Sequence, residues 1–184
     1  MNGNFAVKPY VYKYSELEQK FSRSGIVILV AVGYSDMNQN RKKIFYRIME
    51  NGWKIGSYIN PDAIVRADTA CFGEGNIVFE GVIIGAGCKL GDGNVFYSGS
   101  TLAHHSQVGN FNFLAVRSSV AGRVEIGDEC FFGNNCCTKD YISISDKTLI
   151  GAGCYLDSDV NISGGVFVPQ RNVKLKKSSV EIKL

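Results

Sequence analysis

The chain has few of the residues that build the commonest metal and nucleic-acid sites. Its 184 residues include only two histidines, and its six cysteines form no C-x-x-C pair. A zinc site of paired cysteines is therefore excluded, and a zinc site with three histidine ligands lacks its third ligand. We expect no metal. The net charge of +3 is small, and no basic helix or aromatic RNA-binding motif is present, so we expect no nucleic-acid partner.

Long apolar runs are also missing. No stretch approaches the roughly 20 apolar residues that an α-helix needs to cross a bilayer, so no membrane association is expected. The opening residues, MNGNFAVK, have neither the apolar region nor the cleavage pattern of a secretory signal peptide. The sequence therefore predicts a cytoplasmic protein.

What the chain does have is a repeat of six residues between Phe72 and Val168. Sixteen of the seventeen repeat positions are apolar, and Thr138 is the exception. The repeat positions are Phe72, Val78, Ile84, Leu90, Phe96, Leu102, Val108, Leu114, Val120, Ile126, Phe132, Thr138, Ile144, Ile150, Leu156, Ile162 and Val168. An α-helix repeats every 3.6 residues and cannot keep this register. Short strands joined by regular bends can keep it.

The neighbours of these positions are also regular. The next residue is often glycine, as in Gly73, Gly85 and Gly91, and glycine accepts backbone angles that other residues resist. The residue two places before is usually small. Three hexads would form one triangular coil, and stacked coils would lie about 4.8 Å apart. The pattern predicts a parallel β-helix, because a β-sandwich does not keep one phase for so long.

Four cysteines share the small inward position of the repeat: Cys88, Cys130, Cys136 and Cys154. A free thiol at such a position serves as a small apolar side chain of the core. We therefore expect reduced cysteines, in agreement with a cytoplasmic protein.

Three regions are predicted: a small α/β cap at 1–60, the β-helix at 61–168 and a basic, solvated tail at 169–184. The elements expected in the cap are an extended segment at 1–14, a helix at 15–23 opened by the capping box at Ser15, a strand buried on both faces at 26–32, a helix at 37–50 capped by Asp36 or Ser35, and a strand at 53–59. The apolar side of the second helix should contain Ile44, Phe45, Ile48 and Met49.

The cap contains one candidate for phosphate binding. A buried strand, then Gly33, then the start of a helix would present backbone N–H groups where a phosphate could lie. Most such corners bind nothing, and no G-x-G-x-x-G motif is present, so both interpretations stay open.

The two histidines give the clearest chemical signal. His104 and His105 follow Leu102 at outward positions, because the β-helix interior takes the repeat position and the residue two before it. Gly122 lies eighteen residues, or one coil, after His104. A triangular coil would therefore stack the imidazole of His104 beside the unobstructed backbone N–H of Gly122. A base next to a donor for developing negative charge is what acyl transfer requires.

Several motifs resemble one family. They are AVGYSDMNQNR (31–41), SYINPDA (57–63), AHHSQVGNF (103–111), VAGRVEIGD (120–128) and IGAG (150–153). Together they are similar to the sialic-acid O-acetyltransferase-like family of hexapeptide-repeat sugar acetyltransferases, which includes the N-acetyltransferases of bacillosamine-type nucleotide amino sugars. The resemblance covers about residues 5–170.

This resemblance implies a left-handed β-helix, a homotrimer, and acetyl-CoA as co-substrate between neighbouring coils. The family's catalytic histidine falls on His104, the position where some members have a carboxylate falls on His105, and the acetyl-carbonyl contact falls on the N–H of Gly122. The coenzyme A contacts fall on Phe113, Gly122, Asn134, Gly151 and Ala152. Family members usually begin with a β-strand and a glycine-rich turn that helps to hold the nucleotide, and this sequence begins after that point. Either the rest of the cap holds the nucleotide alone, or the acceptor differs, or the start of the cap is shortened. The cap's candidates for binding the nucleotide-linked sugar are Gly33, Tyr34, Asn38 and Arg41.

The expected function is transfer of acetyl from acetyl-CoA to the amino group of a nucleotide-linked amino-deoxy sugar, by direct attack with His104 as general base. Two alternatives stay open. One is O-acetylation of a sugar hydroxyl, and the other is a non-catalytic trimeric scaffold.

Overall fold

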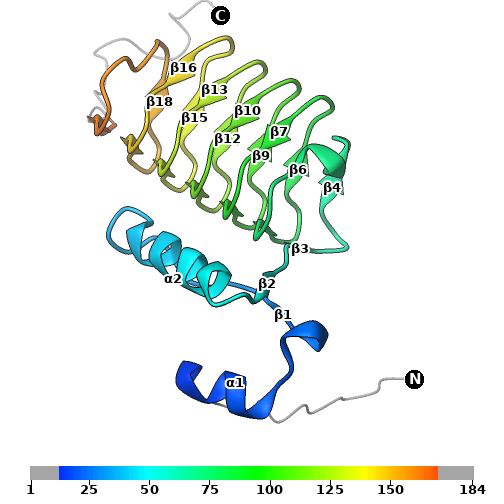
Figure 1. Cartoon of the computed structure of the whole chain (residues 1–184). Helices are drawn as coiled ribbons and strands as arrows, with labels where there is room; N and C mark the ends of the chain where they lie inside the picture. The colour runs from blue at the N-terminus through cyan, green and yellow to red at the C-terminus, as the bar shows by residue number, and fades with distance from the viewer. Residues whose placement is uncertain (1–12, 170–184) are drawn as a thin grey trace, which may run out of the picture.

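The protein is a stack of short parallel strands with a smaller unit packed along one side (Figure 1). The computed structural model describes residues 13–169. Most of the predicted extended segment (1–14) and of the basic tail (169–184) lies outside the described residues. The strands wind into a left-handed parallel β-helix, which confirms the predicted fold class.

Each of the central coils contributes one two-residue strand to each of three faces. The seven-stranded face consists of β3 (Tyr58–Ile59), β5 (Ile77–Val78), β8 (Val95–Phe96), β11 (Phe113–Leu114), β14 (Phe131–Phe132), β17 (Leu149–Ile150) and β19 (Val166–Phe167). The six-stranded face consists of β4 (Ile64–Val65), β6 (Ile83–Ile84), β9 (Thr101–Leu102), β12 (Ser119–Val120), β15 (Cys137–Thr138) and β18 (Tyr155–Leu156). The four-stranded face consists of β7 (Lys89–Leu90), β10 (Gln107–Val108), β13 (Glu125–Ile126) and β16 (Ser143–Ile144).

From β5 to β18, the register of these faces repeats every eighteen residues. Phe113 pairs with Phe131 on one side and with Val95 on the other, and Ser119 pairs with Thr101. One coil therefore contains three hexads. The 3-10 turn η3 (Thr69–Cys71) precedes the first of the regular repeat positions.

The repeat positions form the core of the β-helix. Val78, Ile84 and Phe96 are fully buried, and the four cysteines at the small inward position are buried and free. The repeat fades after Leu156, since the side chains of Ile162 and Val168 are 77% and 71% exposed. Burial of one large apolar side chain from every face of every coil is what stabilises the stack.

The residues that turn the chain at the bends are not the ones that the sequence predicts. The left-handed backbone angles do not fall on the glycines directly after the repeat positions but two residues further on, where many residues are not glycine. These corner positions include Gly75, Gly81, Gly87, Gly93, Gly99, His105, Phe111, Arg117, Arg123, Glu129, Asn135, Tyr141, Lys147 and Gly153. Glycine at position 73 has another cause: a Cβ there would lie 2.7 Å from the carbonyl carbon of Gly91 on the next coil. Close packing of coils, and not a special backbone angle, selects that glycine.

The cap is less regular than predicted. It contains η1 (Tyr14–Glu16), α1 (Leu17–Lys20), η2 (Arg23–Gly25), β1 (Val27–Ile28), α2 (Gln39–Glu50) and β2 (Lys54–Ile55). The predicted strand at 26–32 is wrong in length and burial: within residues 13–169, β1 pairs only with β2, and Val27 is 60% exposed. The predicted capping box at Ser15 and the predicted cap of the second helix by Asp36 or Ser35 are also absent, since no side-chain cap bond forms at the N-cap of η1, α1 or α2.

Helix α2 packs along one corner of the β-helix. Phe45 contacts Phe111, with ring centroids 5.1 Å apart, and Ile48 is buried beside it. Ile44 and Met49, predicted on the same apolar side, are instead 40% and 43% exposed. One helical turn rises about 5.4 Å and one coil about 4.8 Å, so successive turns of α2 meet successive coils.

Candidate active site

His104 and His105 lie in the bend between β9 and β10, where the six-stranded and four-stranded faces meet. Both side chains are exposed, as predicted for outward positions. The ring of His104 lies against Gly122 on the next coil, so that a Cβ added there would be 2.8 Å from Nε2 of His104. The main chains are joined by a 2.9 Å hydrogen bond from the N–H of Arg123 to the carbonyl of His104. The predicted stacking of His104 and Gly122 is therefore present.

The N–H of Gly122 is a free donor beside this imidazole. The adjacent N–H groups of Ala121 and Arg123 donate to Thr138 Oγ1 and to the His104 carbonyl, whereas the N–H of Gly122 makes no hydrogen bond within residues 13–169. Gly122 is itself buried. The arrangement offers a proton acceptor next to a main-chain donor.

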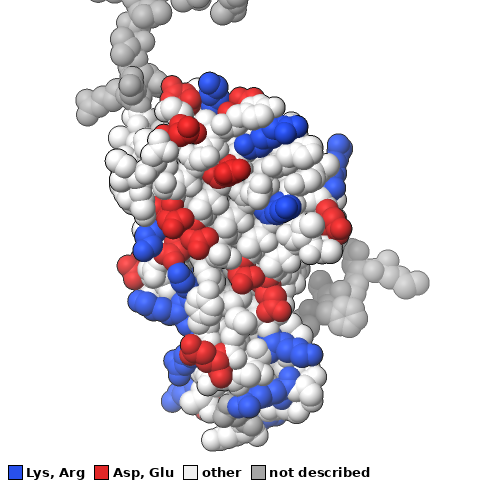
Figure 2. Space-filling view, turned by 45° about the horizontal axis from the view of Figure 1, so that its top comes forward, with Lys and Arg blue, Asp and Glu red and all other residues white. Residues whose placement is uncertain are grey.

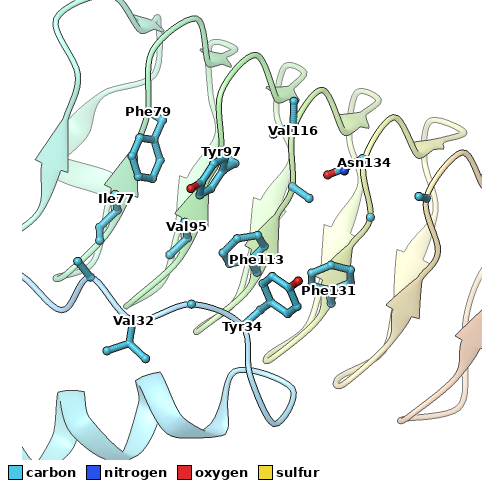
Figure 3. A pocket seen from close by; sticks show the side chains of 15 residues that line it. Val32, Tyr34, Ile77, Phe79, Val95, Tyr97, Phe113, Val116, Phe131 and Asn134 are labelled. Atoms are coloured by element: carbon cyan, nitrogen blue, oxygen red, sulfur yellow. The ribbon is translucent and has the colours of Figure 1, made fainter.

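A second candidate region lies on the seven-stranded face. A pocket of about 440 Å³ opens between the segment after β1 and the outer surface of β5, β8, β11 and β14 (Figure 3). Its lining includes five residues named from the sequence: Gly33, Tyr34, Phe113, Asn134 and Ala152. Gly151 precedes Ala152 at the same edge. Three of the residues expected to contact the co-substrate (Phe113, Asn134 and Ala152) and two of those expected to contact the sugar (Gly33 and Tyr34) thus line one hollow.

Aromatic rings make up much of this pocket. The ring of Tyr34 lies 5.0 Å from that of Phe113 and 4.7 Å from that of Phe131, and Tyr97 packs against Phe79 at 4.6 Å. Sequence reasoning missed Phe131, Tyr97 and Phe79. A signal was present, because the outward residues of this face, Ile77, Val95, Phe113 and Phe131, are apolar at intervals of eighteen. An outward apolar column predicts a covered surface.

Arg41 was expected to bind the sugar nucleotide and instead holds the cap on the β-helix. It is 1% exposed. All five of its N–H groups are directed at main-chain carbonyls, which belong to Val32, Gly33, Gly93, Phe111 and Asn112. Burial lowers the pKa of the guanidinium to about 10. No donor is left for a substrate.

Asn38 has a similar role. Its amide donates to the carbonyls of Glu129 and Cys130, and the side chain is buried. The neighbouring carboxylate of Glu129 is also buried and pairs with Lys42 of α2, which raises the pKa of the lysine ammonium. Asn38 and Glu129 therefore join the start of α2 to the β-helix, and the expectation that Asn38 contacts a substrate is not supported by its position.

The two candidate regions lie at different edges of one chain. His104, His105 and Gly122 do not line the aromatic pocket, and the six-stranded face separates the bend that bears them from the edge at Asn134. The pocket is a hollow of about 440 Å³, whereas the histidine bend has the groups that can move a proton. Both are needed for an acyl transfer between two bound molecules.

Within residues 13–169, no group of three or more His, Cys, Asp or Glu side chains could hold a metal ion. Over the same residues, no helix is both long and apolar enough to cross a bilayer. On the face seen in Figure 2, acidic and basic side chains are interspersed.

Comparison with known proteins finds similarity among solved structures. No protein-family model matches the chain, and no curated protein matches it. The acetyltransferase domain of PglB from Neisseria gonorrhoeae FA1090 is 27% identical, with a TM-score of 0.75 over 83% of this chain and 72% of that one. The same domain in complex with acetyl coenzyme A is 26% identical, with a TM-score of 0.68 over 76% and 68% of the two chains.

A third structure is PerB from Caulobacter crescentus in complex with CoA and GDP-perosamine. It is 28% identical, with a TM-score of 0.64 over 78% of this chain and 67% of that one. The β-helix and these neighbours define the class of the protein, an acyltransferase built on hexapeptide repeats. Within that class, the chain is similar to the sugar acetyltransferases, which confirms the resemblance drawn from its motifs.

Proposed function

We propose that the chain transfers the acetyl group of acetyl-CoA to the amino group of a nucleotide-linked amino-deoxy sugar, for the synthesis of a bacterial surface polysaccharide or glycan. The observation that carries this proposal is the contact of the exposed His104 imidazole with Gly122, whose N–H has no hydrogen-bond partner among the described residues. The neighbours support the choice of substrates. The PglB domain binds acetyl coenzyme A, and PerB, which binds GDP-perosamine, is described as a GDP-perosamine N-acetyl transferase.

The reaction needs one base and one oxyanion donor. The sugar amine attacks the thioester carbonyl carbon, a C–N bond forms, and the carbonyl oxygen becomes an oxyanion that accepts a hydrogen bond from the N–H of Gly122. Nε2 of His104 takes the proton of the amine. Collapse of the intermediate breaks the C–S bond, and the proton passes from His104 to the leaving thiolate of CoA. No covalent acetyl-enzyme is required.

The pocket on the seven-stranded face would hold parts of both substrates. Phe113, Asn134, Gly151 and Ala152 are assigned to acetyl-CoA, together with Gly122. Gly33 and Tyr34 are assigned to the nucleotide of the sugar. The N–H groups of Gly33 and Tyr34 make no hydrogen bond within residues 13–169, which leaves them free for a phosphate oxygen.

A homotrimer would unite the two regions. The six-stranded face that separates them has no charged side chain among its outward strand residues, which are Ile64, Ile83, Thr101, Ser119, Cys137 and Tyr155. An uncharged face of this kind suits burial between copies. The imidazole of one copy would then face the pocket of the next. The six free cysteines suit a reducing compartment, so we assign the reaction to the cytoplasm.

A thiol-release assay with acetyl-CoA and a panel of nucleotide-linked amino sugars tests the proposal. We expect release with at least one acceptor, and a loss of about 10²-fold or more in His104→Ala. Lys89→Ala, an exposed change on the four-stranded face, is the control. Full turnover by His104→Ala would refute the assigned base.

The alternatives give different results. Acetylated product found on a hydroxyl group would favour O-acetylation. If titration calorimetry detects no binding of acetyl-CoA at millimolar concentration, the chain is a scaffold and the proposed enzyme activity is wrong.

A further inference from the structure

His104 and His105 are neighbours whose imidazoles are joined to each other. Their Nδ1 atoms are 3.1 Å apart, within hydrogen-bonding distance, with the ring planes at 79°. A neutral imidazole has one N–H and one lone pair. Two facing Nδ1 atoms can therefore bond only if one is protonated and the other is not. If one ring carries its proton at Nδ1, the other ring must therefore carry its proton at Nε2.

The backbone and two glycines hold this arrangement. His105 occupies a left-handed corner position, with φ of 59°, so its side chain leaves the chain in a different direction from that of His104. Its ring lies over Gly87 on the preceding coil, where an added Cβ would be 2.7 Å from Cδ2. The ring of His104 lies over Gly122 on the following coil. Each ring thus packs on a different coil, over a glycine that leaves room for it because it has no side chain. The two Nδ1 atoms face each other.

We infer that His105 is a positioning residue for the base. Its unprotonated Nδ1 accepts a hydrogen bond from the Nδ1–H of His104, and Nε2 of His104, the nitrogen beside Gly122, keeps its lone pair for the proton of the acceptor amine. The opposite pairing would place the proton of His104 on Nε2 and remove the base. The chemical role of this inference rests on the proposed function, whereas the hydrogen bond and its direction do not.

A neutral partner has a specific consequence. When His104 takes the proton, its imidazolium still donates from Nδ1 to His105, so the hydrogen bond survives the step. His105 gives no full negative charge to offset the imidazolium, unlike a carboxylate at the same place. A charge-assisted bond is stronger than a neutral one, so a carboxylate at position 105 should hold the charged form of His104 more firmly.

The chain itself supplies tolerated replacements for position 105. The equivalent corner positions with φ between 55° and 61° contain Phe111, Glu129 and Asn135. His105→Phe keeps a ring and removes the acceptor. His105→Asn and His105→Glu keep an acceptor oxygen. These three variants therefore separate the loss of the hydrogen bond from any damage to the fold.

The direct test is ¹⁵N NMR of the imidazoles in the free protein. We expect His104 to be protonated at Nδ1 and His105 at Nε2 in the wild type, and His104 to lose its preference for Nδ1–H in His105→Phe but keep it in His105→Asn. In thiol-release kinetics, kcat of His105→Phe should fall about tenfold or more at an unchanged KM for acetyl-CoA, and His105→Asn and His105→Glu should recover most of it.

The outcomes separate this inference from the proposed function. His104 protonated at Nε2 in the wild type, or an unchanged kcat in His105→Phe, would overturn the role of His105 even if acetyl transfer is confirmed. The expected tautomers in a protein that transfers no acetyl group would support the hydrogen bond and overturn the proposed function instead.

Discussion

The Nη2 atom of Arg41 donates to the carbonyl oxygen of Phe111 at 2.9 Å, across seventy residues of sequence. Arg41 belongs to α2 of the cap, and Phe111 to a corner of the β-helix. The guanidinium is buried and reaches carbonyls on both units. This side chain therefore fixes the segment at Gly33 and Tyr34 over the seven-stranded face, and it shapes the pocket without lining it.

Replacement of Arg41 by methionine should detach the cap. Methionine fills a similar volume but leaves the carbonyls of Gly93 and Phe111 without their donor, and each buried unsatisfied polar group costs about 1–3 kcal/mol. We expect Arg41→Met to lower the free energy of unfolding by at least about 2 kcal/mol in denaturant titration. Lys43→Met is the matched control, because Lys43 is exposed on the same helix. Equal stability of the two variants would contradict the role of Arg41.

The role of Arg41 illustrates what the sequence could not reveal. Its partners are main-chain carbonyls, which every residue has, so no pattern of side chains identifies them. The six-residue repeat is different, because each apolar position reports the inward face of its own hexad. The parallel β-helix and the contact of His104 with Gly122 follow from that period, whereas the left-handed sense of the coil is implied by the family resemblance. The pocket does not, since it needs the position of the cap relative to β11 and β14.

The glycines of the repeat also illustrate what the sequence could not reveal. Their regular spacing predicts regular bends, and the bends exist, but the left-handed residues lie two places later and include His105 and Phe111. The sequence indicates where coils approach each other closely. It does not indicate which residue turns the chain, because the stacked coils stabilise a left-handed angle in residues that would otherwise resist it.

Replacement of Gly122 by alanine should displace the base without removing the oxyanion donor. The new Cβ would lie 2.7 Å from Cε1 of His104, closer than atoms can pack, and the backbone at 122 does not have a positive φ. The main-chain N–H remains. We expect kcat to fall at least about tenfold, since misplacement by about 1 Å can cost up to 10²-fold. Gly25→Ala, which meets open space, is the control. Unchanged kcat in Gly122→Ala would show that His104 acts from another position.

The buried thiols should weaken the fold at alkaline pH. Burial raises the pKa of Cys130 and of Cys136 from the ordinary 9.0 to about 12. Below pH 9 both states keep these protons. Between pH 9 and 12 the unfolded chain loses them and the folded chain keeps them, so the free energy of unfolding falls by up to about 1 kcal/mol per pH unit for each thiol.

The double variant Cys130→Ala, Cys136→Ser isolates this effect. Serine already occupies the place equivalent to Cys136 on the preceding coil, as Ser118, and neither replacement titrates in this range. Urea titrations of both proteins at pH 8, 9 and 10 measure the difference. If the free energy of unfolding of the wild type falls with pH no faster than that of the double variant, these thiols do not cause the loss of stability at alkaline pH.

Mixed oligomers should decide whether two copies share each site. His104→Ala removes the proposed base, and Tyr34→Ala removes the ring that packs on Phe113 and Phe131 in the pocket. Each variant alone should be at least about tenfold less active than the wild type. If the base of one copy serves the pocket of the next, some sites in a mixed trimer receive an intact His104 from one chain and an intact Tyr34 from another. Equal amounts of the two variants, unfolded together and refolded, should then regain a measurable fraction of wild-type thiol release, whereas each variant refolded alone should not. Sites built within single chains would show no gain on mixing, because every chain contains one of the two lesions.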